Sequence, residues 1–136
     1  MQHADTTLIA MVGATIGKVG YLTFDATTNQ NVASLYPLDA KVLDASYLFY
    51  ACTTLYDKFL DLGKTGFAMA SLSFIKSLSI KLPTIEKQKE IADVLDRFEK
   101  LCVDISDGIP AEIQARNKQY EYYRDKLLSF EEIKKQ

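Results

Sequence analysis

The first residues that suggest chemistry form the glycine-rich segment VGATIGKVGY, residues 12–21. Such loops can bind phosphate because their backbone N–H groups approach the phosphate oxygens closely. The P-loop of nucleotide hydrolases has four residues between its two glycines and a Ser or Thr after its lysine. Here three residues separate Gly13 from Gly17, and Val19 follows Lys18. The segment therefore departs from a P-loop, and its strand-like continuation favours a turn between two strands.

Other reactive side chains are few. His3 is the only histidine, and the two cysteines, Cys52 and Cys102, lie far apart in the sequence. A clustered His/Cys metal site cannot be assembled from them, and one histidine near the terminus is a poor activator of a nucleophile. Both cysteines fall inside helical patterns, which favours free thiols in a reducing compartment. We therefore predict no clustered His/Cys metal site and no histidine-activated nucleophile.

Length and composition are those of one globular protein. The chain has 136 residues, of which 48% are apolar and 25% charged, and its formal net charge is −2 at pH 7. This composition excludes an intrinsically disordered chain and provides no overall basic surface for nucleic acid. No apolar run approaches the roughly 18 residues of a membrane span, and no signal-peptide pattern is present. We therefore expect a soluble, cytoplasmic protein in which any nucleic-acid binding is local or shared with a partner.

The elements that must position the glycine segment differ in composition from those that follow. Residues 1–84 contain no arginine and no glutamate and are rich in strand-forming Thr, Val, Tyr and Phe. Strand-like runs are predicted at residues 8–12, 18–24, 31–36 and 78–82. Gly20 is expected to mark a β-bulge or a close backbone approach. Asp44 is expected to cap a helix that ends at Gly63, with apolar positions at Leu48, Ala51, Leu55, Phe59 and Leu62.

From residue 85 onward, good helix formers dominate the sequence. Thr84 is a plausible cap for a first helix whose apolar stripe is Ile91, Val94, Leu95, Phe98, Leu101, Cys102 and Ile105. Gly108 and Pro110 interrupt the pattern, and the joint can be a hairpin or a kink. A second helix is predicted over residues 111–133, with the narrower, more polar stripe of a helix that meets another helix. The predicted fold class is α+β: a small β-sheet with one packed helix, followed by two long C-terminal helical segments.

Several segments together resemble one known family. They are GATIGK at residues 13–18, NQN at residues 29–31, SIKLP ending at Pro83, the positions Glu86, Gln88, Ile91 and Leu95 of IEKQKEIADVL, and GIPAEIQARNKQYEYYRDKLLSF at residues 108–130. In this order they closely resemble the DNA-specificity (S) subunit of type I restriction-modification systems. The first motif alone is weak evidence, whereas the ordered series is specific and covers nearly the whole chain.

The resemblance implies a non-catalytic subunit, with no catalytic residues and no cofactor of its own. In this family, target recognition domains each read one half of a bipartite DNA site, and long helices separate them and bind modification subunits. Methyl transfer from S-adenosylmethionine belongs to the modification subunit, and ATP-driven translocation and cleavage belong to the restriction subunit. By analogy, residues 1–84 are a partial target recognition domain and residues 85–136 are a helical spacer and dimerisation region. A complete recognition domain has considerably more sequence before the second region, so we expect a C-terminal fragment.

The resemblance directs attention to side chains that can contact DNA. In the major groove, Arg or Lys commonly binds guanine and Asn or Gln binds adenine. Because residues 1–84 lack arginine, the candidates in loops and at strand ends are Lys18, Asn29, Gln30, Asn31, Lys64, Thr65 and Lys76. For residues 29–31 the alternative is turn chemistry, in which side chains bond the local backbone. For Lys64 and Lys76 the alternative is an ordinary solvated lysine.

The second helix carries the candidate subunit interface. Its aromatic, arginine and aliphatic side chains have the composition of interface centres, and they are Ile113, Tyr120, Tyr123, Arg124, Leu127 and Leu128. The expected partners are double-stranded DNA, the modification (methyltransferase) subunit, the restriction subunit in the full complex, and a second copy of the chain through its C-terminal helices. The alternative is packing of this helix on Phe98 and Leu101 of the same chain.

Two other functions stay open at this point. A truncated fragment could dimerise or bind modification subunits without reading DNA, and the low positive charge and the missing N-terminal material favour this alternative. A nucleotide hydrolase that uses residues 12–21 is the enzyme alternative. Turnover of ATP or GTP that is lost in Lys18→Ala would reveal it.

Overall fold

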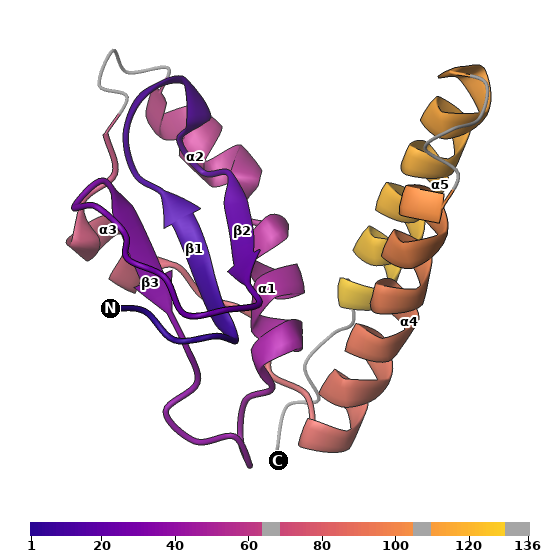
Figure 1. Ribbon diagram of the computed structural model, residues 1–136, viewed down its shortest axis with the longest axis horizontal. Coiled ribbons are helices and arrows are strands. Elements are labelled where there is room, and N and C mark those ends of the chain that lie inside the picture. Colours follow the sequence, from indigo (N-terminus) through magenta and orange to yellow (C-terminus); the bar gives the residue numbers. More distant parts are fainter. Residues whose placement is uncertain (64–68, 105–109, 130–136) are drawn as a thin grey trace, which may run out of the picture. The chain divides into compact units, whose positions relative to one another are not determined.

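The chain forms two compact units. The structure is a computed structural model that describes residues 1–63, 69–104 and 110–129 (Figure 1). Contacts divide it into Met1–Ile80 and Lys81–Gln136. The sequence places the change of architecture a few residues later, after residue 84. Together the two units give an α+β fold, as predicted.

The first unit contains a three-stranded antiparallel sheet. Its strands are β1 (Thr6–Ala10), β2 (Val19–Leu22) and β3 (Val32–Leu35), in the order β2-β1-β3. In the central strand, Ile9 lies opposite Val19 on one side and Ala33 on the other. Three predicted strands are thereby confirmed, each with shifted or shorter bounds.

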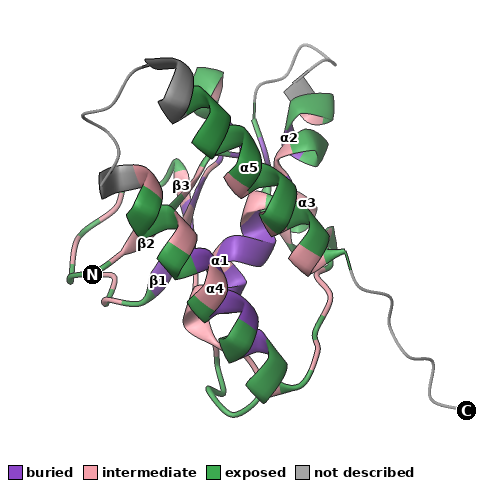
Figure 2. Cartoon of the chain, turned by 90° about the vertical axis from the view of Figure 1, so that its right-hand side faces the viewer, coloured by how far each residue is buried: buried purple, intermediate pink, exposed green. Residues whose placement is uncertain are grey.

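Helices α1 (Ala45–Thr53), α2 (Tyr56–Gly63) and α3 (Leu72–Ser77) complete this unit. Apolar side chains from the sheet and from α1 and α2 bury one another, and their cluster is Ile9, Met11, Ile16, Ala33, Leu48, Cys52, Leu55, Phe59 and Ala70. Phe74 and Ile75 of α3 pack against it. Figure 2 shows buried residues on α1, and within the sheet they lie on β1 and β3, whereas β2 has none. Tyr47 and Tyr50 of α1 are also buried, each 1% exposed, although neither belongs to this cluster.

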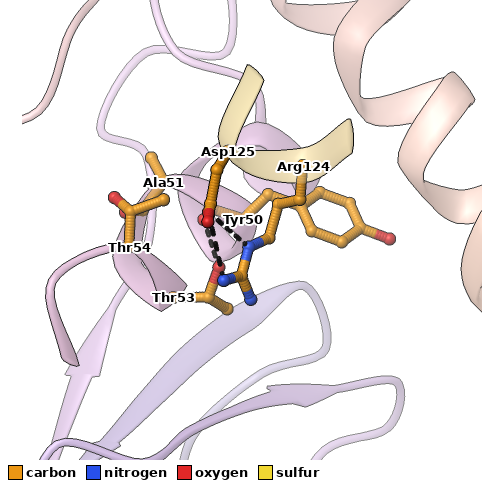
Figure 3. A network of polar contacts seen from close by, with 6 residues as sticks. All are labelled: Tyr50, Ala51, Thr53, Thr54, Arg124 and Asp125. Carbon is orange, nitrogen blue, oxygen red and sulfur yellow. Dashed lines mark hydrogen bonds and ion pairs between the residues drawn. The ribbon is translucent and has the colours of Figure 1, made fainter. Parts of the chain in front are cut away.

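The prediction of a single helix from Asp44 to Gly63 is wrong in one respect, because the structure has two helices here, and the first ends at Thr53. Its start is confirmed: the Asp44 carboxylate accepts a hydrogen bond of 3.0 Å from the Tyr47 N–H. At the break, the hydroxyls of Thr53 and Thr54 donate to the carbonyls of Tyr50 and Ala51, each at 2.6 Å (Figure 3). Threonine hydroxyls that occupy helix carbonyls in this way bend or end a helix.

The glycine segment forms a short 3₁₀ turn, η1 (Gly13–Thr15), between β1 and β2. Gly13 and Gly17 have φ angles of +82° and +83°, which only glycine adopts without cost. The expected bulge or close approach at Gly20 is wrong, since the β1–β2 register runs through it without interruption and a Cβ there would meet nothing within 4 Å. The close approach is instead at Gly17, where a Cβ would lie 2.5 Å from the Phe59 Cβ.

The strand predicted at residues 78–82 is also wrong. α3 precedes it, capped by Ser71, whose hydroxyl accepts a hydrogen bond of 3.1 Å from the Phe74 N–H. After α3 the chain is extended, and Leu78 and Ile80 pack against the core. Alternate apolar residues therefore face the core here as in a strand, but the three-stranded sheet does not include this segment.

The second unit contains two long helices, α4 (Ile85–Asp104) and α5 (Pro110–Leu128). The predicted cap is confirmed, because the Thr84 hydroxyl accepts a hydrogen bond of 3.3 Å from the Lys87 N–H. The fully buried Gln88 side chain donates through Nε2 to the Pro83 carbonyl at 2.9 Å. This bond gives a structural reason for the spacing of proline and glutamine in the sequence.

α4 and α5 pack against each other as an antiparallel pair. The rings of Phe98 and Tyr123 stack with centroids 5.4 Å apart, and the Cys102 thiol lies 4.0 Å from the Arg116 carbonyl. The later residue of α4, Cys102, therefore contacts the earlier residue of α5, Arg116, as expected for antiparallel helices. The chain reverses between the two helices, which answers the question of hairpin or kink, although residues 105–109 lie outside the described ranges.

Candidate nucleic-acid interface

Peptide groups at the C-terminal end of β1 bring together three segments that are far apart in the sequence. The Ala10 N–H donates to the Lys18 carbonyl at 3.0 Å, and the Met11 N–H donates to the Asn31 carbonyl at 2.9 Å. The Met11 carbonyl accepts from the Ala70 N–H at 2.7 Å. We call the resulting surface the β1 end and define it by Val12, Lys18, Asn29, Gln30, Asn31 and Met69.

The polar side chains of residues 29–31, in the turn that leads into β3, differ in their hydrogen bonding. The Asn29 Oδ1 accepts a hydrogen bond of 2.9 Å from the Asn31 N–H, so Asn29 shapes the turn, as the alternative interpretation proposes. Gln30 and Asn31 are exposed. Within the described ranges, no other residue hydrogen-bonds their side-chain amides. These two amides are therefore available to a ligand.

Lysine candidates differ in how the structure positions them. Lys18 is exposed, its backbone lies between η1 and β2, and no acidic side chain pairs with it in the described part of the chain. Lys76 is exposed in the last turn of α3, and none of the backbone hydrogen bonds that define the β1 end comes from this helix. Lys64 and Thr65 lie outside the described residues. Of the two lysine candidates that the structure describes, Lys18 belongs to the β1 end and Lys76 does not.

Two apolar residues at the β1 end were not predicted from the sequence. Val12 and Met69 pair across an antiparallel bridge, yet their side chains are 37% and 60% exposed. They are separated by more than half of the first unit, so no local pattern indicates that they meet. An exposed apolar pair beside free amides differs from an ordinary polar loop, and it is a feature that a ligand can use.

The geometry of the glycine segment differs from that of a nucleotide-binding loop. In a P-loop, the glycines lead into a helix whose N-terminus faces the phosphates. Here η1 leads into the strand β2. The same residues therefore make a strand connection, and Lys18 is exposed at its end.

On α5, the predicted interface residues lie partly against α4. Tyr123 stacks on Phe98, as the intramolecular alternative proposes. Burial raises the pKa of Tyr120 to about 12, with a further contribution from the negative charge of Glu99. The Arg124 guanidinium lies 3.2 Å from the Asp125 carboxylate (Figure 3) and 5.9 Å from the centre of the Tyr120 ring.

The remaining predicted interface residues are Leu127 and Leu128, which are half-buried, and Ile113, whose side chain lies outside the described part.

In the described ranges, no three His, Cys, Asp or Glu side chains form a group that could bind a metal ion. None of the described helices has the length and apolar character needed to cross a membrane.

Comparisons with known proteins all point to one family. A family model described as "Type I restriction modification DNA specificity domain" matches residues 2–115. A putative type I specificity subunit of Mycoplasma pneumoniae is 32% identical over 123 residues, which are 90% of this chain and 40% of that protein. The specificity subunit of a type I restriction enzyme from Escherichia coli is 37% identical over 108 residues, which are 77% of this chain and 26% of that protein.

The fold has a match among solved structures. The crystal structure of the S subunit of a type I restriction-modification system from M. genitalium superposes with a TM-score of 0.61 at 16% sequence identity, covering 97% of this chain and 34% of that chain. The chain thus spans less than half the length of these relatives. Because the family model matches well over half of the residues and extends into both units, the chain belongs to the type I restriction-modification DNA specificity domain family.

Proposed function

We propose that this chain is a DNA-recognition component of a type I restriction-modification system. In this proposal, residues 1–84 contact one part of the DNA target, and the helices of residues 85–136 bind modification subunits. The chain catalyses no reaction itself, because methyl transfer and cleavage belong to the other subunits. The observation that supports it most is the β1 end, where Lys18 and the free amides of Gln30 and Asn31 lie together on a member of this family.

The charge of the chain supports recognition that depends on a partner. A net charge of −2 supplies little of the nonspecific phosphate attraction that dominates most DNA binding. A modification subunit that contacts the duplex from the other side can supply that attraction. The chain itself then needs to make only a few contacts to DNA. It would act in the cytoplasm, together with the DNA and the other subunits.

The test is DNA binding by the chain assembled with its modification subunit, measured on a pool of random duplexes over a range of salt concentrations. Lys18→Ala should weaken binding and reduce the slope of log K against log salt by about one phosphate contact. Lys41→Ala is the matched control, since it removes the same charge from the exposed loop between β3 and α1. The control should bind as the unaltered protein does.

Two results would contradict the proposal. One is an assembled complex that shows no salt-dependent binding to any duplex. The other is an equal loss of binding in Lys18→Ala and Lys41→Ala, because it would indicate a diffuse charge effect without a site at the β1 end.

A further inference from the structure

The free side chains of the β1 end are chemically matched to one kind of base pair. We propose, resting on the function proposed above, that this surface reads an A·T pair in the major groove. Asn31 would bind the adenine, Val12 and Met69 would contact the thymine methyl group, and Lys18 would contact a neighbouring phosphate. Asn29 has no direct role in reading and serves only to shape the turn.

The adenine contact follows from the atoms that are free. Adenine presents the N7 acceptor and the N6 amino donor in the major groove, and an asparagine amide offers one donor and one acceptor at the matching spacing. Asn29 is a poor reader because its Oδ1 already accepts from the Asn31 N–H at 2.9 Å. Asn31 is exposed, and its amide has no hydrogen-bond partner in the described ranges. The same turn that occupies Asn29 therefore leaves Asn31 available.

The thymine contact follows from the exposed apolar pair. A thymine differs from the other bases in the major groove by its C5-methyl group, which apolar side chains contact. Val12 and Met69 pair with each other and are exposed. The backbone of Met11 connects their segments to that of Asn31, since the Met11 N–H bonds the Asn31 carbonyl and the Met11 C=O accepts from the Ala70 N–H. The proposed adenine reader and methyl reader thus lie on segments that are hydrogen-bonded to the same residue, Met11.

The composition of the first unit argues against a G·C pair at this position. Guanine is most commonly read by the two parallel donors of an arginine, and residues 1–84 contain none. Lys18 is a compact point charge at the start of β2, which suits a phosphate contact that positions the domain without selecting sequence. Its contribution should therefore be equal on all duplexes.

The experiment compares two charge-matched variants of the chain in the complex with its modification subunit. Sequence preference is measured by selection from a random duplex pool. Asn31→Asp removes the amide donor and should lower the preference for A·T at one position by about 5- to 150-fold. Asn29→Asp adds the same charge two residues away but keeps the oxygen that accepts from the Asn31 N–H. It should weaken binding to all duplexes alike and leave the preference unchanged.

A second measurement needs no change in the contact to adenine. Replacing the thymine of the selected pair by deoxyuridine removes only the methyl group. The unaltered complex should bind the uracil duplex more weakly than the thymine duplex. Met69→Ala should bind the two duplexes more nearly alike, because the side chain that detects the methyl group is shortened.

Three outcomes would overturn the inference. The first is a full preference for A·T in Asn31→Asp. The second is equal binding of thymine and uracil duplexes by the unaltered complex. The third is loss of modification-subunit binding in Met69→Ala, which would make the apolar pair a protein contact. In all three cases the proposed function survives if the unaltered complex binds DNA in a salt-dependent way, whereas a complex that binds no DNA removes both.

Discussion

At the scale of single residues, Gly13 and Gly17 have the same backbone conformation and different surroundings. A Cβ at Gly17 would lie 2.5 Å from the Phe59 Cβ, whereas one at Gly13 would meet nothing within 4 Å. Gly13→Ala should cost only the left-handed backbone, about 1–2 kcal/mol of unfolding free energy. Gly17→Ala should cost more than about 3 kcal/mol, since it also displaces a buried phenylalanine. Urea unfolding of both variants checks this, and equal losses would contradict the close approach.

The buried thiol of Cys52 predicts how stability depends on pH. Burial raises the pKa of Cys52 from its ordinary value of 9.0 to about 11. The unfolded chain therefore loses this proton first, so the stabilisation is fully present below pH 9 and is lost as the pH rises through 11. Burial likewise raises the pKa of Tyr47 to about 12, which extends the loss to higher pH.

The measurement is the free energy of unfolding at a series of pH values from 8 upward. We expect it to fall above pH 9, and to fall less steeply in Cys52→Ala than in the unaltered protein. Cys102→Ala is the control, since that cysteine is only half-buried. A slope that is the same in Cys52→Ala and in the unaltered protein would show that the thiol does not contribute.

At the scale of elements, the contact between α4 and α5 decides how much of α5 is free for a partner. The rings of Phe98 and Tyr123 stack at 5.4 Å with an interplanar angle of 28°. A double-mutant cycle with Phe98→Leu and Tyr123→Leu should give a coupling energy of about 0.5–1.5 kcal/mol. The control cycle pairs Phe98→Leu with Tyr122→Leu, because Tyr122 is 61% exposed and contacts Tyr123. Its coupling should be much smaller, and equal coupling in the two cycles would contradict the hairpin.

At the scale of the whole molecule, the hairpin leaves apolar surface to cover. Most described side chains of α5 are exposed (Figure 2), and the large apolar ones among them are Tyr122 and Tyr123; Leu101 of α4 is 53% exposed. Exposed apolar patches of this kind commonly form interfaces. We therefore expect the chain to self-associate through its C-terminal helices.

Light scattering coupled to gel filtration tests this expectation over a range of protein concentrations. The double variant Leu101→Lys with Tyr122→Lys should shift the chain towards the monomer, because both side chains are exposed on the hairpin. Leu38→Lys is the control, since Leu38 is 95% exposed in the first unit. A monomer at every concentration of the unaltered protein would remove the prediction of a homo-oligomer.

Local signals in the sequence were sufficient for much of the fold. The caps at Asp44 and Thr84 each depend on a backbone N–H three residues away, and the first-turn position of Pro110 depends on the fixed φ of its own ring. All three lie where the sequence predicts. Three strands and the two C-terminal helices were recognisable by their periodicity for the same reason. The ordered motifs also indicated the family, which the comparisons confirm.

What only the tertiary structure decided depends on partners that are distant in the sequence. Alternating apolar residues at 78–82 predict a strand, but a strand also requires a neighbouring backbone, which no local pattern reveals. The candidate site shows the same limit: the sequence proposed Lys18 and residues 29–31 separately, and the peptide groups of Ala10 and Met11 join them. Likewise, one hydrogen bond distinguishes the roles of Asn29 and Asn31. The Asn29 side chain accepts a bond that shapes the turn, which leaves the Asn31 amide available to a ligand.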